Sequence, residues 1–303
     1  MPVSIDGIAM CGHAMPRWLS RLWPEVWLAM VCLCLPAVAQ AGDAGQANPV
    51  YTFAVVPQYT PLTVHRRWYP LLEELSKQAG ITYQLRIYDN FNEFIKDLKQ
   101  GRPDFAYLAP YHLVLARRAQ GYIPLIRDSS TNLQGLVVVP KNSPYRNIRE
   151  LDGKQIDFPS PNAFAASLYL RAYLQEHEKI SFTPRYLGNH DNVYRHVASG
   201  FSEAGGGVNT TLSRQPAGLQ ARLRVLFKMP VVASHPVAAH PRVPEHVRKQ
   251  FVKLITTRVT NGKMQGYLDR VQLNKPVMAD YNKDYAPLES LKLERYLVEG
   301  GDL

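Results

Sequence analysis

The sequence predicts an α/β protein of two lobes, each a mostly parallel sheet flanked by helices. Apolar, β-branched runs alternate with amphipathic segments over residues 51–109, and this order with short connections is typical of parallel sheets. A second series of the same kind begins after the apolar run at residues 133–140. No repeat, low-complexity tract or long linker separates the two series. We therefore expect the chain to cross between the lobes more than once and to leave a cleft between them.

The first series contains three predicted strands and two predicted helices. Pro57 ends the first apolar run, and Gly80 stops a helix whose apolar residues recur at helical spacing from Trp68 onward. Asn90 is expected to cap the second helix, which Gly101 ends. The strands are expected at residues 51–57, 83–88 and 104–109, and the helices at 68–79 and 91–98. Ligands of such sheets bind at the carboxyl ends of the strands.

The second series is followed by a mainly helical region. Its helix at 164–174 is apolar on most sides, as expected for a helix packed on a sheet. Pro244 opens a helix over 245–255, and residues 285–297 are expected to end the fold as a helix. The further strands are expected at residues 155–158, 183–187, 204–208 and 224–227.

The N-terminal segment has the features of a secretory signal peptide. Arg17 and Arg21 precede an apolar core at residues 26–35, and the small-x-small pattern Ala39, Gln40, Ala41 follows. This core is much shorter than the ~20 residues of a membrane-spanning helix, so we expect no permanent membrane anchor. We assign residues 1–41 to a cleavable signal peptide and expect a periplasmic protein.

Cleavage after Ala41 leaves 303 − 41 = 262 residues without any of the three cysteines, Cys11, Cys32 and Cys34. A disulfide, thiol catalysis or a cysteine-bound metal is then excluded. The removed segment carries two basic and two acidic residues, so the net charge stays at 33 − 23 = +10. Nucleic acid is not expected as a partner after export, and the charge is compatible either with an anionic small ligand or with a basic surface alone.

Four stretches in order carry a resemblance to a known family. They are residues 53–57 with 68–72, 101–111, 151–160 and 188–195. Together they resemble the periplasmic substrate-binding proteins of phosphonate, phosphite and phosphate ABC transporters, over nearly the whole chain after residue 41. The resemblance implies a type II periplasmic-binding-protein fold with a hinge of two crossovers. It places lobe one at 50–133 plus 235–303 and lobe two at 134–234, with crossovers near 132–134 and 233–235.

The resemblance implies that an oxyanion binds at a turn before the lobe-two helix. The equivalent turn here comprises residues 160–165, and a helix start offers unpaired N–H groups and a positive dipole end. Where the family has consecutive hydroxyl side chains, this chain has Ala163, Phe164 and Ala165. Backbone amides would then be the donors, with partial compensation from side chains such as Ser160 and Asn162.

The resemblance also matches His190 to an anion-contacting histidine at another helix start. An imidazole N–H donates to an oxyanion, although His190 and Asp191 could equally be only a polar helix cap. Tyr59, Tyr107 and Tyr111 fall where the family lines its cleft, and Tyr107 has the alternative of a buried sheet residue.

A further departure from the family lies in and after the strand at 204–208. Family members that bind an aminoalkyl group have an acidic residue here, whereas this chain has three glycines followed by Asn209 and Thr210. We count both among the ligand-binding residues and expect no preference for an amine. The glycines allow close approach of a ligand or a helix, or serve packing alone.

The expected function is capture of a small oxyanion and delivery to a permease, by a protein that the resemblance favours as a monomer. One alternative is a sensor subunit for a histidine kinase or chemoreceptor; another is a binder of a different small ligand. An enzyme is not expected, because no nucleophile elbow, zinc signature or phosphate loop occurs. No cofactor and no metal site are expected.

Overall fold

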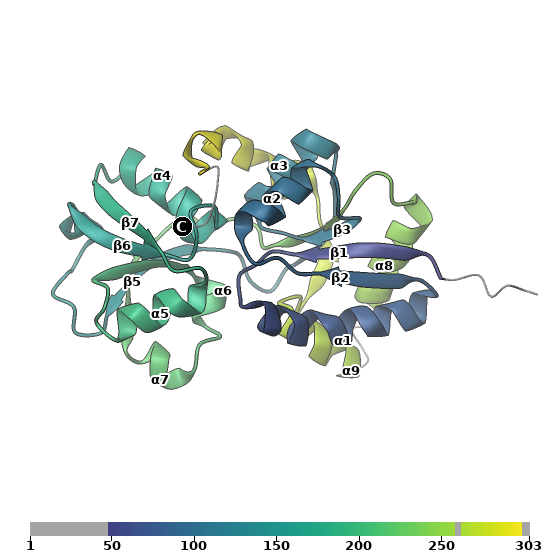
Figure 1. Ribbon diagram of the computed structural model, residues 1–303, viewed down its shortest axis with the longest axis horizontal. Coiled ribbons are helices and arrows are strands. Elements are labelled where there is room, and N and C mark those ends of the chain that lie inside the picture. The colour runs from purple at the N-terminus through teal and green to yellow at the C-terminus, as the bar shows by residue number, and fades with distance from the viewer. Residues whose placement is uncertain (1–47, 258–261, 299–303) are drawn as a thin grey trace, which may run out of the picture. The chain divides into compact units, whose positions relative to one another are not determined.

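The computed structural model describes residues 48–257 and 262–298, which belong to one compact unit. The expected signal peptide at residues 1–41 lies outside these residues. The described strands form two sheets (Figure 1). The first sheet has the strand order β11-β4-β10-β3-β1-β2. Its strands are β1 (Val50–Val55), β2 (Thr82–Arg86), β3 (Phe105–Tyr107), β4 (Ile123–Asp128), β10 (Pro236–Ala239) and β11 (Pro276–Met278).

The second sheet is built only from the middle of the chain. Its strand order is β7-β6-β8-β5-β9. The strands are β5 (Gly135–Pro140), β6 (Lys154–Phe158), β7 (Phe182–Tyr186), β8 (Ala204–Val208) and β9 (Leu223–Lys228). The order of strands and helices confirms the predicted α/β class.

Strand direction refines the prediction of mostly parallel sheets. In the first sheet β1 to β4 share one direction, while β10 pairs antiparallel with β3 and β4, and β11 with β4. In the second sheet β6 to β9 share one direction and β5 runs against β8 and β9. The strands β5 and β10 run against their neighbours, and each is the first strand that the chain forms after it crosses from the other sheet. Both sheets are therefore mixed.

Helices cover both faces of each sheet (Figure 1). Against the first sheet, α1 and α9 lie on one face and α2 and α3 on the other. The helices of this part are α1 (Pro61–Ala79), α2 (Phe91–Lys99), α3 (Pro110–Gln120), α8 (Glu245–Thr257), α9 (Gly262–Arg270) and α10 (Tyr281–Asp284). Asn90 caps α2 as predicted, since its side chain accepts a hydrogen bond from Glu93 N at 2.9 Å.

The second sheet carries α4 on one face and α5 on the other (Figure 1). The helices of this part are α4 (Tyr169–Glu176), α5 (His190–Ala198), α6 (Asn209–Leu212) and α7 (Ala217–Gln220), with a 3-10 turn at Ile148–Leu151. The predicted helix at 164–174 begins differently from a regular helix, because residues Phe164–Leu168 form a π-helical turn before α4. Residues near the C-terminus form two 3-10 turns, Ala286–Leu291 and Leu293–Tyr296, where we expected one helix.

An aromatic cluster fills the core of the first sheet. Phe53, Phe105 and Phe251 lie within 6.2 Å of one another between ring centroids, and Trp68 lies 5.2 Å from Phe53. The cluster joins β1 and β3 to α1 and α8. This explains why the apolar runs of the first series form a buried sheet.

Two crossovers connect the sheets, after β4 and after β9. They meet in one antiparallel bridge between Leu133 and Val232. The side chain of Asn209 holds the first crossover, since its Oδ1 accepts from Gln134 N at 3.0 Å and its Nδ2 donates to Asn132 O at 2.8 Å. Among the residues described, none of the helices combines the length and the apolar character needed to cross a bilayer.

Candidate functional site

A small pocket lies between the two sheets, at the carboxyl ends of their strands. Val56 and Gln58 follow β1, Ala109 follows β3, His190 follows β7, and Val208 ends β8. This is the edge at which ligands of α/β sheets bind. Its cavity volume is about 10 Å³, which is room for about one water molecule. The lining residues are Val56, Gln58, Phe91, Ala109, Leu133, Ala163, Phe164, Ala165, Ala166, His190, Val208 and His235.

The turn after β6 brings backbone amides to this pocket. The first helical hydrogen bond runs from Ser167 N to Ala163 O at 2.9 Å, and Leu168 N donates to the same oxygen at 3.0 Å. The amides of Phe164, Ala165 and Ala166 therefore precede the first helical bond, as N-terminal amides do. Ala163 N, one of the expected donors, instead donates to Ser160 O at 3.3 Å.

His190 lies at the first position of α5 with only 2% of its surface exposed. Burial lowers the pKa of His190 to about 3, so the imidazole is neutral at neutral pH. The helix is capped by Asn189, whose side chain accepts from Asn192 N at 3.0 Å. Asp191 points elsewhere and accepts from Gln215 Nε2 at 2.8 Å. His190 is therefore not the cap of its own helix.

A hydroxyl pair behind His190 orients its ring. Nδ1 of His190 lies 3.2 Å from Thr211 Oγ1, which lies 2.7 Å from the Tyr194 hydroxyl. The Tyr194 hydroxyl also donates to Val208 O at 3.1 Å, and Thr211 Oγ1 lies 3.2 Å from the same oxygen. When Thr211 donates to Nδ1, the neutral imidazole carries its proton on Nε2. His190 then offers an N–H donor and no positive charge.

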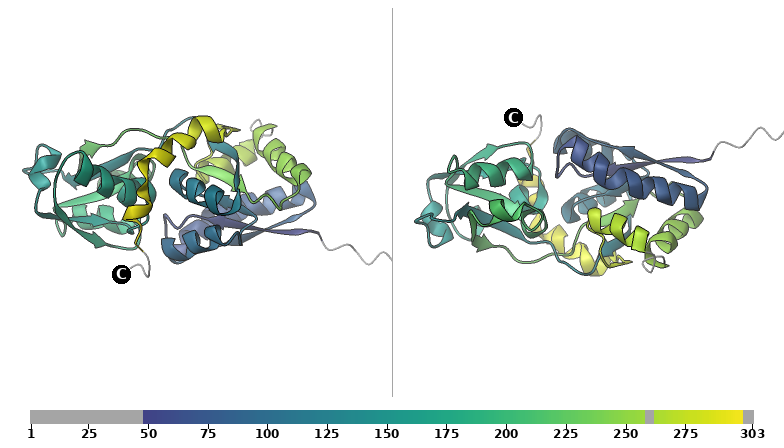
Figure 2. Two further views of the ribbon diagram at one scale, coloured as in Figure 1. Left: turned by 90° about the horizontal axis from the view of Figure 1, so that it is seen from above. Right: turned by 90° about the horizontal axis from the view of Figure 1, so that it is seen from below.

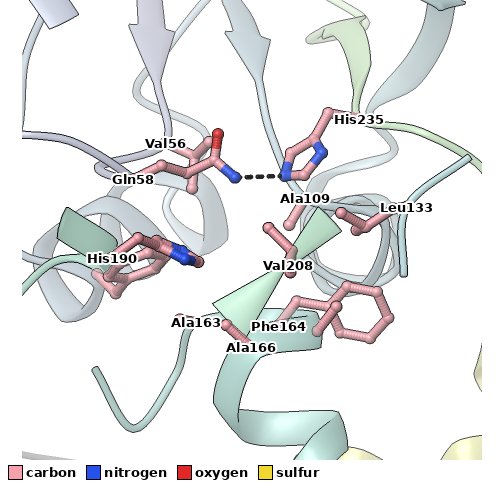
Figure 3. A pocket seen from close by; sticks show the side chains of 12 residues that line it. Val56, Gln58, Ala109, Leu133, Ala163, Phe164, Ala166, His190, Val208 and His235 are labelled. Carbon is pink, nitrogen blue, oxygen red and sulfur yellow. Dashed lines mark hydrogen bonds between the residues drawn. The ribbon is translucent and has the colours of Figure 1, made fainter. Parts of the chain in front are cut away.

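The first sheet contributes a polar pair that we did not predict from the sequence. Gln58 Nε2 lies 3.1 Å from His235 Nε2, and both residues are buried. Since the amide nitrogen of Gln58 only donates, His235 accepts at Nε2 and is protonated at Nδ1. Burial lowers the pKa of His235 to about 3, with smaller effects from His112 and His190. Figure 3 shows this pair and His190 around the same space, beside the start of the π-helical turn.

The three expected tyrosines lie outside this pocket. The Tyr59 hydroxyl accepts from Gln272 Nε2 at 3.0 Å, and Arg67 lies 3.9 Å above its ring. Tyr107 is buried in β3 between Trp68 and His235. This position agrees with the alternative interpretation of Tyr107 as a buried sheet residue. The Tyr111 hydroxyl donates to Glu294 Oε2 at 2.6 Å, and its ring stacks on Phe164.

A second, larger cavity adjoins the pocket, because Leu133 and His235 line both. Its volume is about 140 Å³. Thr210 lines it with a buried Oγ1 that has no hydrogen-bond partner. The side chain of Asn209 instead forms hydrogen bonds with the first crossover. The other lining residues are Tyr107, Asp128, Thr131, Ser213, Arg214, Ser234, Gln272 and Asn274.

The remaining two expected residues support the turn. Ser160 is buried. The side chain of Asn162 bonds to the backbone of Val298 and to Asn92, so it does not serve as a side-chain donor toward the pocket. Within the described part of the chain, no group of three or more His, Cys, Asp or Glu residues could hold a metal ion.

Glycines of β8 and β5 allow close packing. A Cβ at Gly206 in β8 would overlap Ala166 O and the Phe158 ring, and a Cβ at Gly135 in β5 would overlap Ala165 O. These glycines therefore let the backbone of the turn rest directly on the second sheet.

Comparisons with known proteins concern the family and the fold. A family model described as "ABC transporter, phosphonate, periplasmic substrate-binding protein" matches residues 53–285. A binding protein component of an ABC phosphonate transporter from Pseudomonas aeruginosa is similar in structure, with a TM-score of 0.73, 14% identity, and coverage of 82% of this chain and 88% of that one.

PhnD1 from Prochlorococcus marinus, solved with methylphosphonate, has a TM-score of 0.72 and 18% identity, over 80% of this chain and 96% of its own. XAC2383 from Xanthomonas citri, bound to chloride ion, has a TM-score of 0.66 and 14% identity, over 82% and 98%. At these identities the likeness concerns the fold.

Proposed function

The chain belongs to the family of periplasmic substrate-binding proteins of phosphonate ABC transporters, and from this we propose that it captures a phosphonate, phosphite or phosphate ion and delivers it to a permease. One observation carries the choice of ligand: the start of the π-helical turn, His190, and the Gln58–His235 pair converge on one pocket at the strand ends. We infer that the protein binds its ligand without a chemical step and acts as a monomer. A signal peptide in residues 1–41 would direct its export.

The proposed lobes are residues 50–133 plus 235–303 and residues 134–234. Each contains one of the two sheets, and both crossovers pass through the Leu133–Val232 bridge. Rotation about this bridge would open the pocket, whose present volume of about 10 Å³ is too small for a phosphonate. We therefore expect the lobes to part for entry and to close around the ligand.

The proposed ligand is held by neutral donors. No Lys, Arg, Asp or Glu is among the residues that line the pocket. The donors are the amides of Phe164 and Ala165, the Nε2–H of His190 and the Gln58 amide, and each hydrogen bond to an anion contributes ~1.5–3 kcal/mol. Because no cation offsets a second negative charge, we expect singly charged tetrahedral anions to bind more tightly than doubly charged ones.

Calorimetry with the protein lacking residues 1–41 tests the proposal. The ligands are methylphosphonate, phosphite, phosphate, aminoethylphosphonate and sulfate, each at pH 6 and pH 8. Binding of at least one of the phosphorus oxyanions, tighter at pH 6 where the singly charged form is more abundant, is expected. Binding of none of the phosphorus oxyanions at either pH would contradict the proposal.

A further inference from the structure

The last described part of the chain passes from the first sheet to the second. Residues 293–298, which we name the C-terminal strap, begin with the 3-10 turn Leu293–Tyr296. Figure 2 shows this part, in yellow, reaching the second sheet beside α4. The strap contacts the turn at residues 160–165, which carries the proposed ligand donors.

Val298 and Asn162 form the most direct contact. Asn162 Oδ1 accepts from Val298 N at 3.1 Å, and its Nδ2 donates to Val298 O at 2.9 Å. The side chain thus pairs with both main-chain groups of one strap residue. Because only 3% of Asn162 is exposed, loss of Val298 would remove the hydrogen bond to its buried Oδ1, while Nδ2 keeps its bond to Asn92.

Arg171 joins the turn and the strap through a single guanidinium group. Its Nη2 donates to Pro161 O at 2.9 Å and to Tyr296 O at 3.1 Å, and its Nε donates to Ser167 Oγ at 3.2 Å. The planar group fixes the positions of these acceptors relative to one another. The position of the Pro161 carbonyl is therefore linked to that of the strap.

Tyr111, the second residue of α3, supplies the third link. Its hydroxyl accepts from Leu293 N at 2.8 Å and donates to Glu294, and its ring stacks on Phe164 with a centroid distance of 5.9 Å. Phe164 is the first residue of the π-helical turn. The strap therefore also fixes the ring against which this residue packs.

The turn is thus tied to the strap at Pro161, Asn162 and Phe164. We propose that the C-terminal strap holds the amides of residues 164–166 in the geometry that binds the ligand, with Asn162 as the main positioning residue. This inference rests on the proposed function for its ligand, but the order of the turn can be measured without one. A turn that is ordered before binding loses less conformational entropy on binding.

Two variants remove the main contact. Asn162→Ala removes the turn side, and a chain ending at Leu297 removes the strap side while keeping the buried Leu293. Lys249→Ala is the control, because Lys249 belongs to neither the strap nor the turn and pairs with Glu245 on the exposed surface of α8. Hydrogen exchange of peptides covering residues 160–168 is measured first, with no ligand. Affinity for methylphosphonate and phosphite is then measured by calorimetry.

Both variants should exchange the turn amides about tenfold faster than the wild type and should bind the ligand about tenfold more weakly. The control should change neither quantity. If the wild type binds no oxyanion, the proposed function fails and the exchange data alone decide on the strap. Unchanged exchange in both variants would overturn the strap inference, even where the wild type binds the ligand well.

Discussion

Leu133 and Val232 exchange two main-chain hydrogen bonds of 2.9 Å, which join the two crossovers at one point. We expect the proposed lobes to rotate about this pairing, because both connecting segments share one short bridge. Leu133 also lines the small pocket. A change in the angle between the crossovers would therefore move a residue of the pocket wall.

Asn209→Ala should weaken this junction. The variant leaves Gln134 N and Asn132 O without their side-chain partner, so we expect a loss of about 1–3 kcal/mol in the free energy of unfolding. Urea unfolding of the protein lacking residues 1–41 measures it. Asn282→Ala, at an exposed position, should change stability little. Equal stability of both variants would argue against a clamp at Asn209.

His190→Ala should weaken oxyanion binding by about tenfold or more, because a hydrogen bond to an anion is lost. His246→Ala is the matched control, since His246 is exposed and lies on α8. Calorimetry with the oxyanion that binds the wild type most tightly measures the affinity of both variants. An unchanged affinity of His190→Ala would remove His190 from the site.

Stability should fall as the pH drops from about 6.5 toward 4. Burial lowers the pKa values of His190 and His235 to about 3 and that of His112 to about 4, from an ordinary value of 6.5. The unfolded chain therefore binds more protons than the folded chain in this window, and each histidine contributes up to ~1.4 kcal/mol per pH unit.

Thermal unfolding between pH 7 and pH 5 tests this, because most carboxylates stay ionised there. His112→Gln keeps a donor for the carbonyl of Asn162, which lies 3.0 Å from His112 Nε2, but does not titrate. Its pH dependence should be shallower than that of the wild type. Parallel curves for both proteins would show that burial does not lower the pKa of His112.

Gly206→Ala should destabilise the second sheet. The added Cβ overlaps Ala166 O, a backbone atom that cannot rotate away, so we expect a loss of at least ~2 kcal/mol. Gly266→Ala is the control, because Gly266 lies in α9 with nothing within 4 Å of the added Cβ. That change should stabilise by about 0.5–1 kcal/mol. Chemical unfolding compares the two; a stable Gly206→Ala protein would contradict the close packing.

Aminoethylphosphonate should bind no more tightly than methylphosphonate. The acid in the adjoining cavity, Asp128, already accepts from Ser130 Oγ, Thr131 N and Lys275 N. Thr210→Glu places a carboxylate at the unpartnered Oγ1 position and should favour the amine by about tenfold. Competition calorimetry measures the ratio in both proteins. A wild-type preference for the amine would assign Asp128 to the ligand.

The fold was largely predictable because its strands and helices are marked by local patterns. The apolar run before Pro57 and the Asn90 cap are examples. Three neighbouring elements, α3, β4 and β10, were not predicted. The helix α3 is buried over most of its length, so it lacks a polar face, and β10 has only four residues and begins at Pro236.

The site was predictable in part. His190 and the turn residues Ala163, Phe164 and Ala165 were expected and line one pocket. Gln58 and His235 were missed, because each is a single polar residue whose partner lies 177 positions away. Their positions still carried a signal, since Gln58 follows the first predicted strand and His235 stands at the second predicted crossover. Polar residues at such positions can be screened as candidates.

The way in which the turn is supported also matters for protein engineering. Its shape depends on contacts of Pro161, Asn162 and Phe164 and on the glycines beneath it, whereas the side chains of Ala163 and Ala165 line the pocket. The positions proposed to set specificity therefore differ from those that hold the turn in place. We expect serine introduced at 163 and 165 to change the ligand preference while these hydrogen bonds stay in place, so the turn is a candidate framework for anion biosensors.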